Sequence, residues 1–451
     1  MTTITLAEWE TSQKNIPISE LLEKYSTEIS KSKSIGDFSS RNIYSKGQCL
    51  INNGNNVGII EFGTNKEHCR LELRPKLKID QKGNFWRFLP KMLDSLCNFE
   101  GFEEHLFLDP EKTIILPAGC NIVPLLTLSF VSLCDKVIQK GMLRKYINKR
   151  DELTRIKGKI DFSMFVKGQS YNKNKIPCSY YDLTFDNNEN QIVLWCAHKL
   201  LRETRKIAMK NKGEISIVKK LREQYILMQE EISLVPKSRS DVDSLNLSAI
   251  SQNYIELMNV CKAILSESLF SFNENEQKES KGINFIIDMD WIFEQYMTNI
   301  FFEVVKEENM SGLVLNAQLK QTLCDNNKIK IKPDLLISQN NKVIAVIDFK
   351  WKLSEQNNNA DFYQIICYGL AELSRYDHEF GEINTYLFSV SDQNKLDLSI
   401  NNIDCISKVF SQKKVINIKK LALSANMFND QDPKVIEMTL KTEVKLFLKS
   451  L

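Results

Sequence analysis

Two aspartates and a lysine stand in neighbouring apolar runs in the last third of the chain. Asp334 lies in the run 329–337, and Asp348 and Lys350 end the run 343–351. Both runs are predicted to be strands of one hairpin, which sets Asp334 near Asp348. Because side chains alternate along a strand, Asp348 and Lys350 share one face. The three side chains are therefore expected on one patch of a sheet.

Two carboxylates and a lysine on one patch have the chemistry of a Mg²⁺-dependent phosphodiesterase. The acids hold the hard cation through oxygen. The metal polarises the phosphate and helps to ionise a water, while the lysine orients that water or neutralises developing charge. The alternative is a charged hairpin with both acids in solvated positions. We favour the catalytic interpretation, because Asp348 ends an apolar run and an unpaired carboxylate is unfavourable at the edge of a core.

Three further polar side chains lie on helices predicted before and after this hairpin. A helix that begins near Asp290 could present Glu294 to the same metal, although an exposed helix glutamate is the simpler alternative. Gln364 and Tyr368 stand four residues apart, which places both on one face of a helix expected at 360–376. They could brace the site or contact phosphate, and they could equally form the polar edge of a packed helix.

The elements that must position these residues predict an α+β multidomain protein. At 451 residues the chain is too long for one ordinary core. We expect an N-terminal β-rich region of mixed α/β character at 1–165 and a helical middle region at 166–282, with a polar linker at 273–282. An α/β domain is expected at 283–451, in the order helix, three strands, helix, strand (αβββαβ).

The individual elements follow from hydrophobic periodicity and turn residues. Helices are predicted at 85–96, 125–147, 190–209 and 360–376. Strands are predicted at 57–63, 69–76, 313–323, 328–337, 342–351 and 383–390, with the hairpin turn at 338–342.

Composition bounds the class of protein. Hydrophobic content of 43% and charged content of 26% are typical of a soluble globular protein, and a net charge of +3 is too small to identify a partner. Eleven cysteines without a CxxC pair, and only four histidines, argue against a zinc site and a disulfide scaffold. The start of the chain lacks signal-peptide features and no apolar run has membrane-spanning length, so a cytoplasmic protein without a membrane span is expected. No GxxxxGK[ST] stretch is present, so no nucleotide site is recognised.

Charged segments upstream of the hairpin allow two interpretations. Two basic clusters could contact DNA phosphates, or they could be solvated helix faces interspersed with acids. The first comprises Lys136, Lys140, Arg144, Lys145, Lys149, Arg150 and Arg155, and the second Arg202, Arg205, Lys206, Lys210, Lys219 and Lys220. The run 186–189 lacks the spacing of a calcium loop, and a helix N-terminus is predicted there.

The candidate residues, taken in order, resemble the PD-(D/E)XK nuclease superfamily. More narrowly, the chain resembles the McrC family, the nuclease subunit of McrBC-type 5-methylcytosine-dependent restriction systems. The stretches that carry this resemblance span most of the chain and are 71–76, 156–162, 181–184 with Asp186 and Glu189-Asn190, 289–294 and 348–352. Phe349 stands where the last motif usually has Thr, and its side chain is expected to point away from the metal.

The resemblance implies a restriction-endonuclease-like C-terminal domain with Mg²⁺ as its cofactor. The implied metal ligands are Asp334, Asp348 and Glu294, with Lys350 positioning or activating water and with Gln364 and Tyr368 in support. It also implies a McrB-like AAA+ GTPase hexamer as partner, which binds GTP, recognises methylated double-stranded DNA and is engaged by region 1–165. Because one site cuts one strand, double-strand cleavage requires two nuclease domains or two partner-bound complexes to come together.

Two other functions remain open at this point. The chain could be the nuclease subunit of a related sequence-specific restriction or defence system that does not depend on methylation. It could also be an adaptor that mainly activates an AAA+ ring, with cutting secondary or lost. The intact set of two acids and a lysine argues against loss of cutting.

Overall fold

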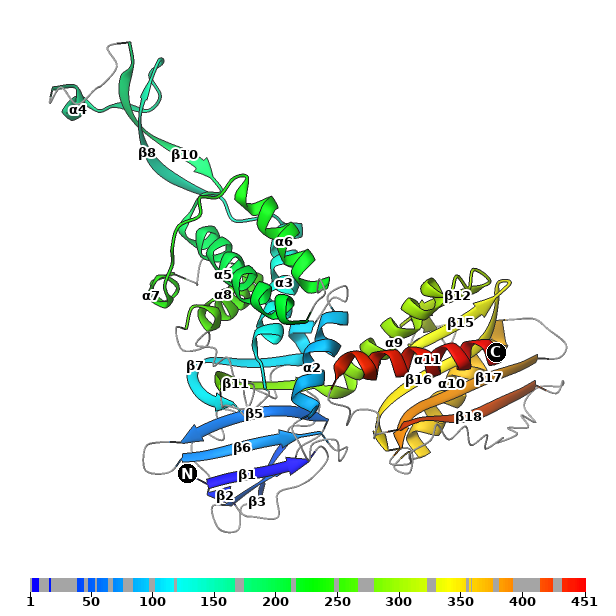
Figure 1. Cartoon of the computed structure of the whole chain (residues 1–451). Coiled ribbons are helices and arrows are strands. Elements are labelled where there is room, and N and C mark those ends of the chain that lie inside the picture. The colour runs from blue at the N-terminus through cyan, green and yellow to red at the C-terminus, as the bar shows by residue number, and fades with distance from the viewer. Residues whose placement is uncertain are drawn as a thin grey trace. The chain divides into compact units, whose positions relative to one another are not determined.

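The computed structural model describes the greater part of the chain (Figure 1). The described residues are 2–7, 16–17, 39–43, 48–52, 55–63, 68–75, 84–96, 102–116, 120–166, 174–211, 216–246, 251–266, 280–322, 330–353, 357, 359–375, 381–391, 414–424 and 432–451. The chain divides into two units, one formed by Met1–Leu125 with Ser271–Leu451 and the other by Leu126–Phe270. The three-part division at 165 and 282 stays a prediction. Of the predicted linker, residues 273–279 lie outside the described residues, and 280–282 begin a strand.

The first sheet of the first unit has five strands in the order β1-β6-β5-β11-β7. They are β1 (Thr2–Ala7), β5 (Asn56–Gly63), β6 (His68–Arg74), β7 (Leu106–Leu116) and β11 (Ser280–Asp288). Strand β1 runs parallel to β6, and the other neighbours are antiparallel. The predicted strands at 57–63 and 69–76 are thereby confirmed as β5 and β6.

Smaller elements accompany this sheet. They are the three-stranded sheet of β2 (Ile16–Pro17), β3 (Ser39–Ile43) and β4 (Gln48–Asn52), the helix α2 (Asn84–Ser95) and the 3-10 helix η3 (Phe102–His105). Helix α2 confirms the helix predicted at 85–96.

The second sheet of the same unit also has five strands, in the order β12-β15-β16-β17-β18. They are β12 (Leu313–Ala317), β15 (Leu335–Gln339), β16 (Lys342–Leu353), β17 (Gly381–Ser391) and β18 (Lys414–Ser424). The helices are α9 (Met289–Glu307), α10 (Asn359–Arg375) and α11 (Pro433–Ser450). Pairing is antiparallel from β12 to β16 and parallel from β16 to β18. The strands of this sheet follow the predicted order of helix, three strands, helix and strand, but the short strands β13 and β14 stand between β12 and β15, and β18 and α11 come after the predicted elements.

Helices cover both faces of this second sheet. On one face Phe293 of α9 packs on Trp351, and Phe301 of α9 packs on Phe349, with ring centroids 5.0 and 5.6 Å apart. On the other face Ile365 of α10 belongs to a buried apolar cluster together with Leu336, Val346, Tyr368 and Ile416. Because neighbours in a strand point to opposite faces, the packing of Phe349 against α9 places Asp348 and Lys350 on the face of α10.

Two predicted strands are interrupted. The run 328–337 forms the short strand β14 (Lys330–Ile331), paired with β13 (Gln321–Thr322), and pairing resumes only at β15. The prediction that Asp334 lies inside one continuous strand is therefore wrong, since Pro333 has no N–H to donate to a ladder. The run 313–323 likewise breaks after Ala317, where Gln318 has a φ of 49°.

The hairpin turn is tighter than predicted. Asn340 and Asn341 alone connect β15 and β16, with φ values of 52° and 62°. Asparagine tolerates this left-handed conformation, which two-residue hairpin turns require. The turn predicted at 338–342 is corrected to these two residues.

The second unit combines helices with a long strand pair that projects from them (Figure 1). The helices are α3 (Val123–Lys140), which begins in the first unit, α5 (Asn188–Asn211), α6 (Ser216–Gln229), α7 (Arg239–Asp243) and α8 (Gln252–Ile264). We call the projecting part the arm; it consists of β8 (Lys145–Leu153), β9 (Lys159–Ile160), α4 (Phe162–Val166) and β10 (Ile176–Thr184). The helix predicted at 125–147 is wrong beyond Lys140, because Gly141 adopts a φ of 93° and ends the helix.

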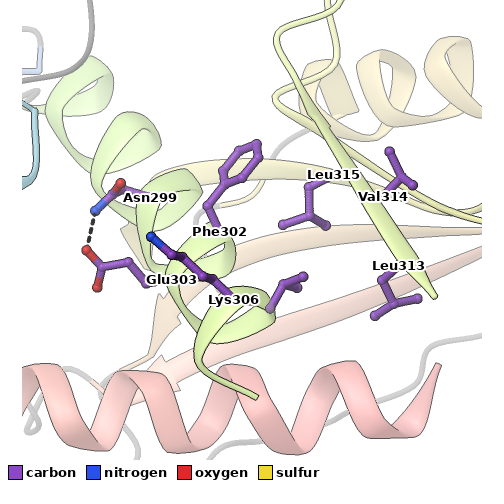
Figure 2. A pocket seen from close by; sticks show the side chains of 8 residues that line it. Asn299, Phe302, Glu303, Lys306, Leu313, Val314 and Leu315 are labelled. Carbon is purple, nitrogen blue, oxygen red and sulfur yellow. Dashed lines mark hydrogen bonds between the residues drawn. The ribbon is translucent and has the colours of Figure 1, made fainter. Parts of the chain in front are cut away.

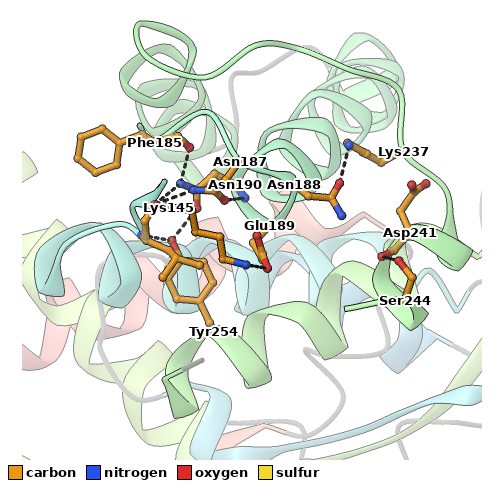
Figure 3. A network of polar contacts seen from close by, with 11 residues as sticks. Lys145, Phe185, Asn187, Asn188, Glu189, Asn190, Lys237, Asp241, Ser244 and Tyr254 are labelled. Atoms are coloured by element: carbon orange, nitrogen blue, oxygen red, sulfur yellow. Dashed lines mark hydrogen bonds and ion pairs between the residues drawn. The ribbon is translucent and has the colours of Figure 1, made fainter. Parts of the chain in front are cut away.

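Buried polar contacts fix the arm at its root (Figure 3). Asn190 donates to the carbonyl oxygens of Leu143 and Phe185, at 2.9 and 2.8 Å. Tyr254 donates its hydroxyl proton to Asn190 at 2.7 Å and accepts from the Leu143 amide at 2.7 Å. The side chain of Asn187 accepts from the Asn190 amide at 3.1 Å, which confirms the helix N-terminus predicted at 186–189.

The structure bears on the expectations about disulfides and about membrane spans. Cys120, Cys134, Cys178, Cys196 and Cys261 are free and buried, and Cys367 is free and half-buried. None of the helices in the described ranges combines the length and the apolar character of a membrane span.

Candidate active site

The lysine of the predicted site joins two elements of the second sheet. Lys350 Nζ on β16 lies 2.9 Å from Oδ2 of Asp348 on the same strand. It also donates to Oε1 of Gln364 on α10 at 3.1 Å. Gln364 in turn donates to the hydroxyl of Tyr368 at 2.6 Å. The structure thus connects Gln364 and Tyr368 to Lys350, and their role in bracing the site stays a prediction.

The acids gather on the other side of Asp348. Strand pairing sets Leu335 opposite Ile347, which brings Asp334 beside Asp348 across the hairpin. Asp334 lies within hydrogen-bonding reach of both Asp348 and Glu294. All six predicted side chains thus form one connected group, drawn from α9, β16, α10 and the residue before β15.

Two of the three carboxyls, those of Asp334 and Glu294, accept a well-aligned hydrogen bond. Asp334 Oδ2 accepts from the backbone N–H of Phe349 at 2.7 Å. Glu294 Oε1 accepts from Nε2 of Gln318 at 2.5 Å. Gln318 had no sequence signal of its own; its φ of 49° turns the chain after β12, and its backbone N–H donates to the Asp334 carbonyl at 3.0 Å.

Burial raises the pKa of all three acids, and repulsion by the other two adds to the shift of Asp334. Asp334 is 8% exposed and Asp348 is fully buried. Burial, followed by the charges of Asp348 and Glu294, raises the pKa of Asp334 well above its ordinary value. Burial likewise raises the pKa of Asp348 and of Glu294, against the opposing effects of Lys350 and Gln318 respectively. A nearby cation would stabilise the ionised form of these buried acids.

Lys350 supplies part of that positive charge. Burial lowers the pKa of Lys350, but the charges of Asp348 and Asp334 outweigh this effect and the net pKa is raised. The side chain therefore remains an ammonium at neutral pH. It can donate hydrogen bonds and neutralise negative charge.

Asp348 has oxygen atoms available for a metal. In the described part of the chain, neither of its buried oxygens receives a well-aligned hydrogen bond, although Lys350 lies at ion-pair distance. A buried carboxylate with unsatisfied oxygens fits a divalent cation, and Mg²⁺ is commonly held by one or two carboxylates with water and phosphate completing its shell. Within the described ranges, no three Asp, Glu, His or Cys side chains stand ready to hold one ion. The fit therefore rests on Asp334 and Asp348, and Glu294 as a third ligand stays a prediction.

Further charged residues border the site and were not singled out from the sequence. Lys352 is ion-paired with Asp361 at the start of α10, and Asp361 adds to the raised pKa of Asp348. Asp290 precedes Glu294 by one turn of α9. Burial and then the charge of Asp288 raise the pKa of Asp290 to about 7, while Lys350 and Lys352 oppose the shift.

Several members of the predicted basic clusters are paired within the chain. Lys145 pairs with Glu189, Lys149 with Asp182 at 2.9 Å, and Lys220 with Asp135 at 2.5 Å. Of the two interpretations of these clusters, solvated and acid-paired faces agree with these contacts. The contribution of the remaining basic residues to DNA binding stays a prediction.

A groove on the distal half of α9 is separate from the candidate site (Figure 2). It is lined by Asn299, Phe302, Glu303, Val305, Lys306, Leu313, Val314 and Leu315. Asn299 donates to Glu303 at 2.9 Å across one turn of the helix. None of the six candidate residues contributes to this lining.

The described residues define a mixed α+β protein that carries a buried set of acids with one lysine on a five-stranded sheet. The chain belongs to the family described as McrBC 5-methylcytosine restriction system component, which matches residues 51–380. The resemblance to McrBC-type systems is thereby confirmed.

Solved structures of low sequence identity are also similar to the chain. One is a refined half-complex from the tetradecameric assembly of Thermococcus gammatolerans McrB AAA+ hexamers with bound McrC, with 16% identity, a TM-score of 0.43, and coverage of 98% of this chain and 100% of that one. Another is a cryo-EM structure of the Thermococcus gammatolerans McrBC complex, with 16% identity, a TM-score of 0.29, and coverage of 67% of this chain and 88% of that one. No curated protein matches the chain.

Proposed function

We propose that this protein is the Mg²⁺-dependent DNA endonuclease subunit of a McrBC-like, modification-dependent restriction system in the cytoplasm. The family supports the restriction system, and the site supports cutting. The observation that carries the proposal is the approach of Asp334, Asp348 and Lys350 beside β16, the central strand of a sheet whose main elements follow the order αβββαβ. We assign residues 283–451 to a PD-(D/E)XK restriction-endonuclease-like domain on this basis.

Asp334 and Asp348 would hold the cation, with Glu294 completing the site. A bound Mg²⁺ at this place supplies a Lewis acid for the scissile phosphate and a water of lowered pKa. The two carboxylates lose their mutual repulsion when the ion is bound, because their charge is then compensated. Their burial keeps bulk water from competing for the ligand positions.

Lys350 acts as a fixed ammonium in this proposal. Its contact with Asp348 and its hydrogen bond to Gln364 hold Nζ on the face where the phosphate would lie. From there it positions the attacking water or neutralises charge that develops on the phosphate. Gln364 and Tyr368 are positioning residues, because they orient the lysine without a reacting role of their own.

An AAA+ GTPase partner accounts for the part of the chain outside the nuclease domain. We propose a McrB-like hexamer that binds GTP and modified DNA and is engaged through region 1–165. This region includes β8 of the arm, on which Tyr146 is 70% exposed; Tyr181 and Leu183 of β10 share its face and are 69% and 46% exposed. Aromatic residues on an uncovered sheet face are typical of a protein interface. The arm would stimulate the partner's hydrolysis, while the nuclease domain cuts.

One substitution separates the two activities. Asp348→Ala is expected to abolish DNA cleavage in the reconstituted system while the stimulation of GTP hydrolysis by the partner remains. Cleavage of methylated and unmethylated plasmids in parallel tests the dependence on modification. Cutting by Asp348→Ala at the wild-type rate would overturn the assignment of the active site.

A further inference from the structure

Strand β11 and helix α9 meet without a connecting loop. Strand β11 ends at Asp288 and α9 begins at Met289. Strand β11 lies between β5 and β7 in the first sheet, whereas α9 carries Glu294 against the second sheet. This corner is therefore a direct mechanical link between the N-terminal sheet and the proposed cleavage site.

Asp288 is the centre of the corner. It is 6% exposed, and its Oδ1 accepts from the backbone N–H of Trp291 at 3.3 Å, which caps the first turn of α9. Two side chains from the first sheet and its surroundings bind the same carboxylate. Asn55, just before β5, donates to Oδ1 at 2.7 Å, and His105 Nδ1, just before β7, lies 3.1 Å from Oδ2.

Asn55 and His105 each make a second contact with the start of α9. The carbonyl of Asn55 accepts from the backbone N–H of Met289 at 3.0 Å, and its side chain also hydrogen-bonds Asp290. The ring of His105 stacks on the indole of Trp291, with centroids 4.4 Å apart and an interplanar angle of 12°. The first turn of α9 is thus held by two residues that lie just before strands β5 and β7 of the first sheet.

The strand that leads into this corner is itself fixed. Asn284 is fully buried at a register shift in β11, and it exchanges two hydrogen bonds with the backbone of Glu61 on β5, at 2.9 and 3.1 Å. Displacement of the sheet would therefore carry β11 and Asp288 with it. Glu294 stands only six residues further along one continuous helix, so its position follows that of the corner.

We propose that Asn55 and His105 are positioning residues that lock the Asp288 corner and so set the place of Glu294 beside Asp334. The N-terminal sheet would thereby control how strongly the acids bind Mg²⁺. This inference rests on the proposed nuclease function and adds a regulatory route to it. Residues that orient metal ligands from outside commonly change affinity by about 10- to 100-fold when they are removed.

The test measures Mg²⁺ binding to the full-length protein by titration calorimetry. Asn55→Ala is expected to weaken binding by about tenfold. The decisive comparison places the same change in a Glu294→Gln background. Because Asn55 acts through Glu294, the effect of Asn55→Ala should there fall below about twofold. His105→Gln, which keeps an N–H donor but loses the stacked ring, should give a smaller effect in the same direction.

A matched control breaks contacts at the opposite end of α9. Lys441 pairs with Glu303 and Glu307 at 2.8 and 2.7 Å, and Lys441→Ala should lower the melting temperature while Mg²⁺ binding stays at the wild-type value. The inference is overturned if Asn55→Ala binds Mg²⁺ like the wild type, or if its effect persists undiminished without Glu294. A wild-type protein that neither binds Mg²⁺ nor cuts DNA would instead overturn the proposed function itself.

Discussion

Lys350 lies 2.9 Å from the fully buried carboxylate of Asp348, two positions away on the same strand. The alternation of side chains along β16 dictates this proximity, because residues two apart share a face. The hydrogen bond to Gln364 fixes the other side of the ammonium at 3.1 Å. The lysine is thus held between an acid that needs a cation and a neutral residue that sets its direction.

Removal of the lysine charge is expected to affect the rate more than the fold. Lys350→Met should lower the single-turnover cleavage rate by roughly 10²- to 10³-fold, since a fixed donor at developing charge is worth that much. Tyr368→Phe is the control on the same chain of contacts; it removes only the hydroxyl that Gln364 contacts and should change the rate less than about tenfold. Equal rates for Lys350→Met and the wild type would exclude a catalytic lysine.

Neutralising one buried acid should stabilise the metal-free protein. Asp334→Asn retains an oxygen that accepts from Phe349, and it removes the repulsion between Asp334 and the charges of Asp348 and Glu294. The melting temperature in EDTA should rise by a few degrees, on the scale of about 2–4 °C per kcal/mol for a domain of this size. Added Mg²⁺ should then shift the variant much less than the wild type. A full Mg²⁺-dependent shift in the variant would contradict a ligand role for Asp334.

The sequence predicts that these side chains come together because the signals that place them are local. A spacing of two residues on a strand places Lys350 on the same face as Asp348. A spacing of four residues on a helix places Gln364 on the same face as Tyr368. The pairing of two adjacent strands adds Asp334. The contact of Glu294 with Gln318 depends on a left-handed residue after β12, and that of Asp288 with Asn55 joins residues 233 positions apart. The hydrophobic periodicity of the sequence predicts neither of these two contacts.

Errors in the predicted elements arose where one residue overrides its neighbours. Pro333 interrupts an otherwise continuous strand pattern, and Gly141 ends a helix whose apolar periodicity continues into β8. The predicted helix 125–147 includes the first residues of β8, because Tyr146 and Ile147 extend the apolar periodicity of the helix. Strand pairing between β8 and β10 overrides the local preference.

The raised pKa of Asp290 predicts a specific pH dependence of stability. Its pKa of about 7 in the folded chain lies above the ordinary value of 3.8, so the folded state binds this proton more tightly than the unfolded state. The stability of the wild type should therefore fall as the pH rises from about 4 to about 7, and this loss should level off above that range. Asp290→Asn removes the titration, and its melting temperature relative to the wild type should increase from about pH 5 to about pH 8. A difference that is independent of pH would contradict the shift.

The polar contacts at the root of the arm should be costly to remove. Asn190 is fully buried and makes three side-chain hydrogen bonds, so Asn190→Ala should lower the free energy of unfolding by roughly 2–3 kcal/mol, because its partners lose their contacts. Tyr254→Phe keeps the ring and should cost about 1 kcal/mol. Denaturant titration measures both losses. A Tyr254→Phe variant that loses as much stability as Asn190→Ala would show that the tyrosine hydroxyl holds the root as strongly as the asparagine side chain does.

The exposed aromatic residues of the arm should contribute to stimulation of the partner and not to the stability of the fold. Tyr146 and Tyr181 lie on one face of the β8–β10 pair and are 70% and 69% exposed, so the double change to alanine should leave the melting temperature within about 1 °C of the wild type. The same variant should lose at least about tenfold in its stimulation of the partner's GTP hydrolysis, since interface aromatics commonly contribute more than 1 kcal/mol each. Met438→Ala is the matched control, because Met438 is 69% exposed on α11 and outside the arm. Undiminished stimulation by the double variant would assign the partner surface to another part of region 1–165.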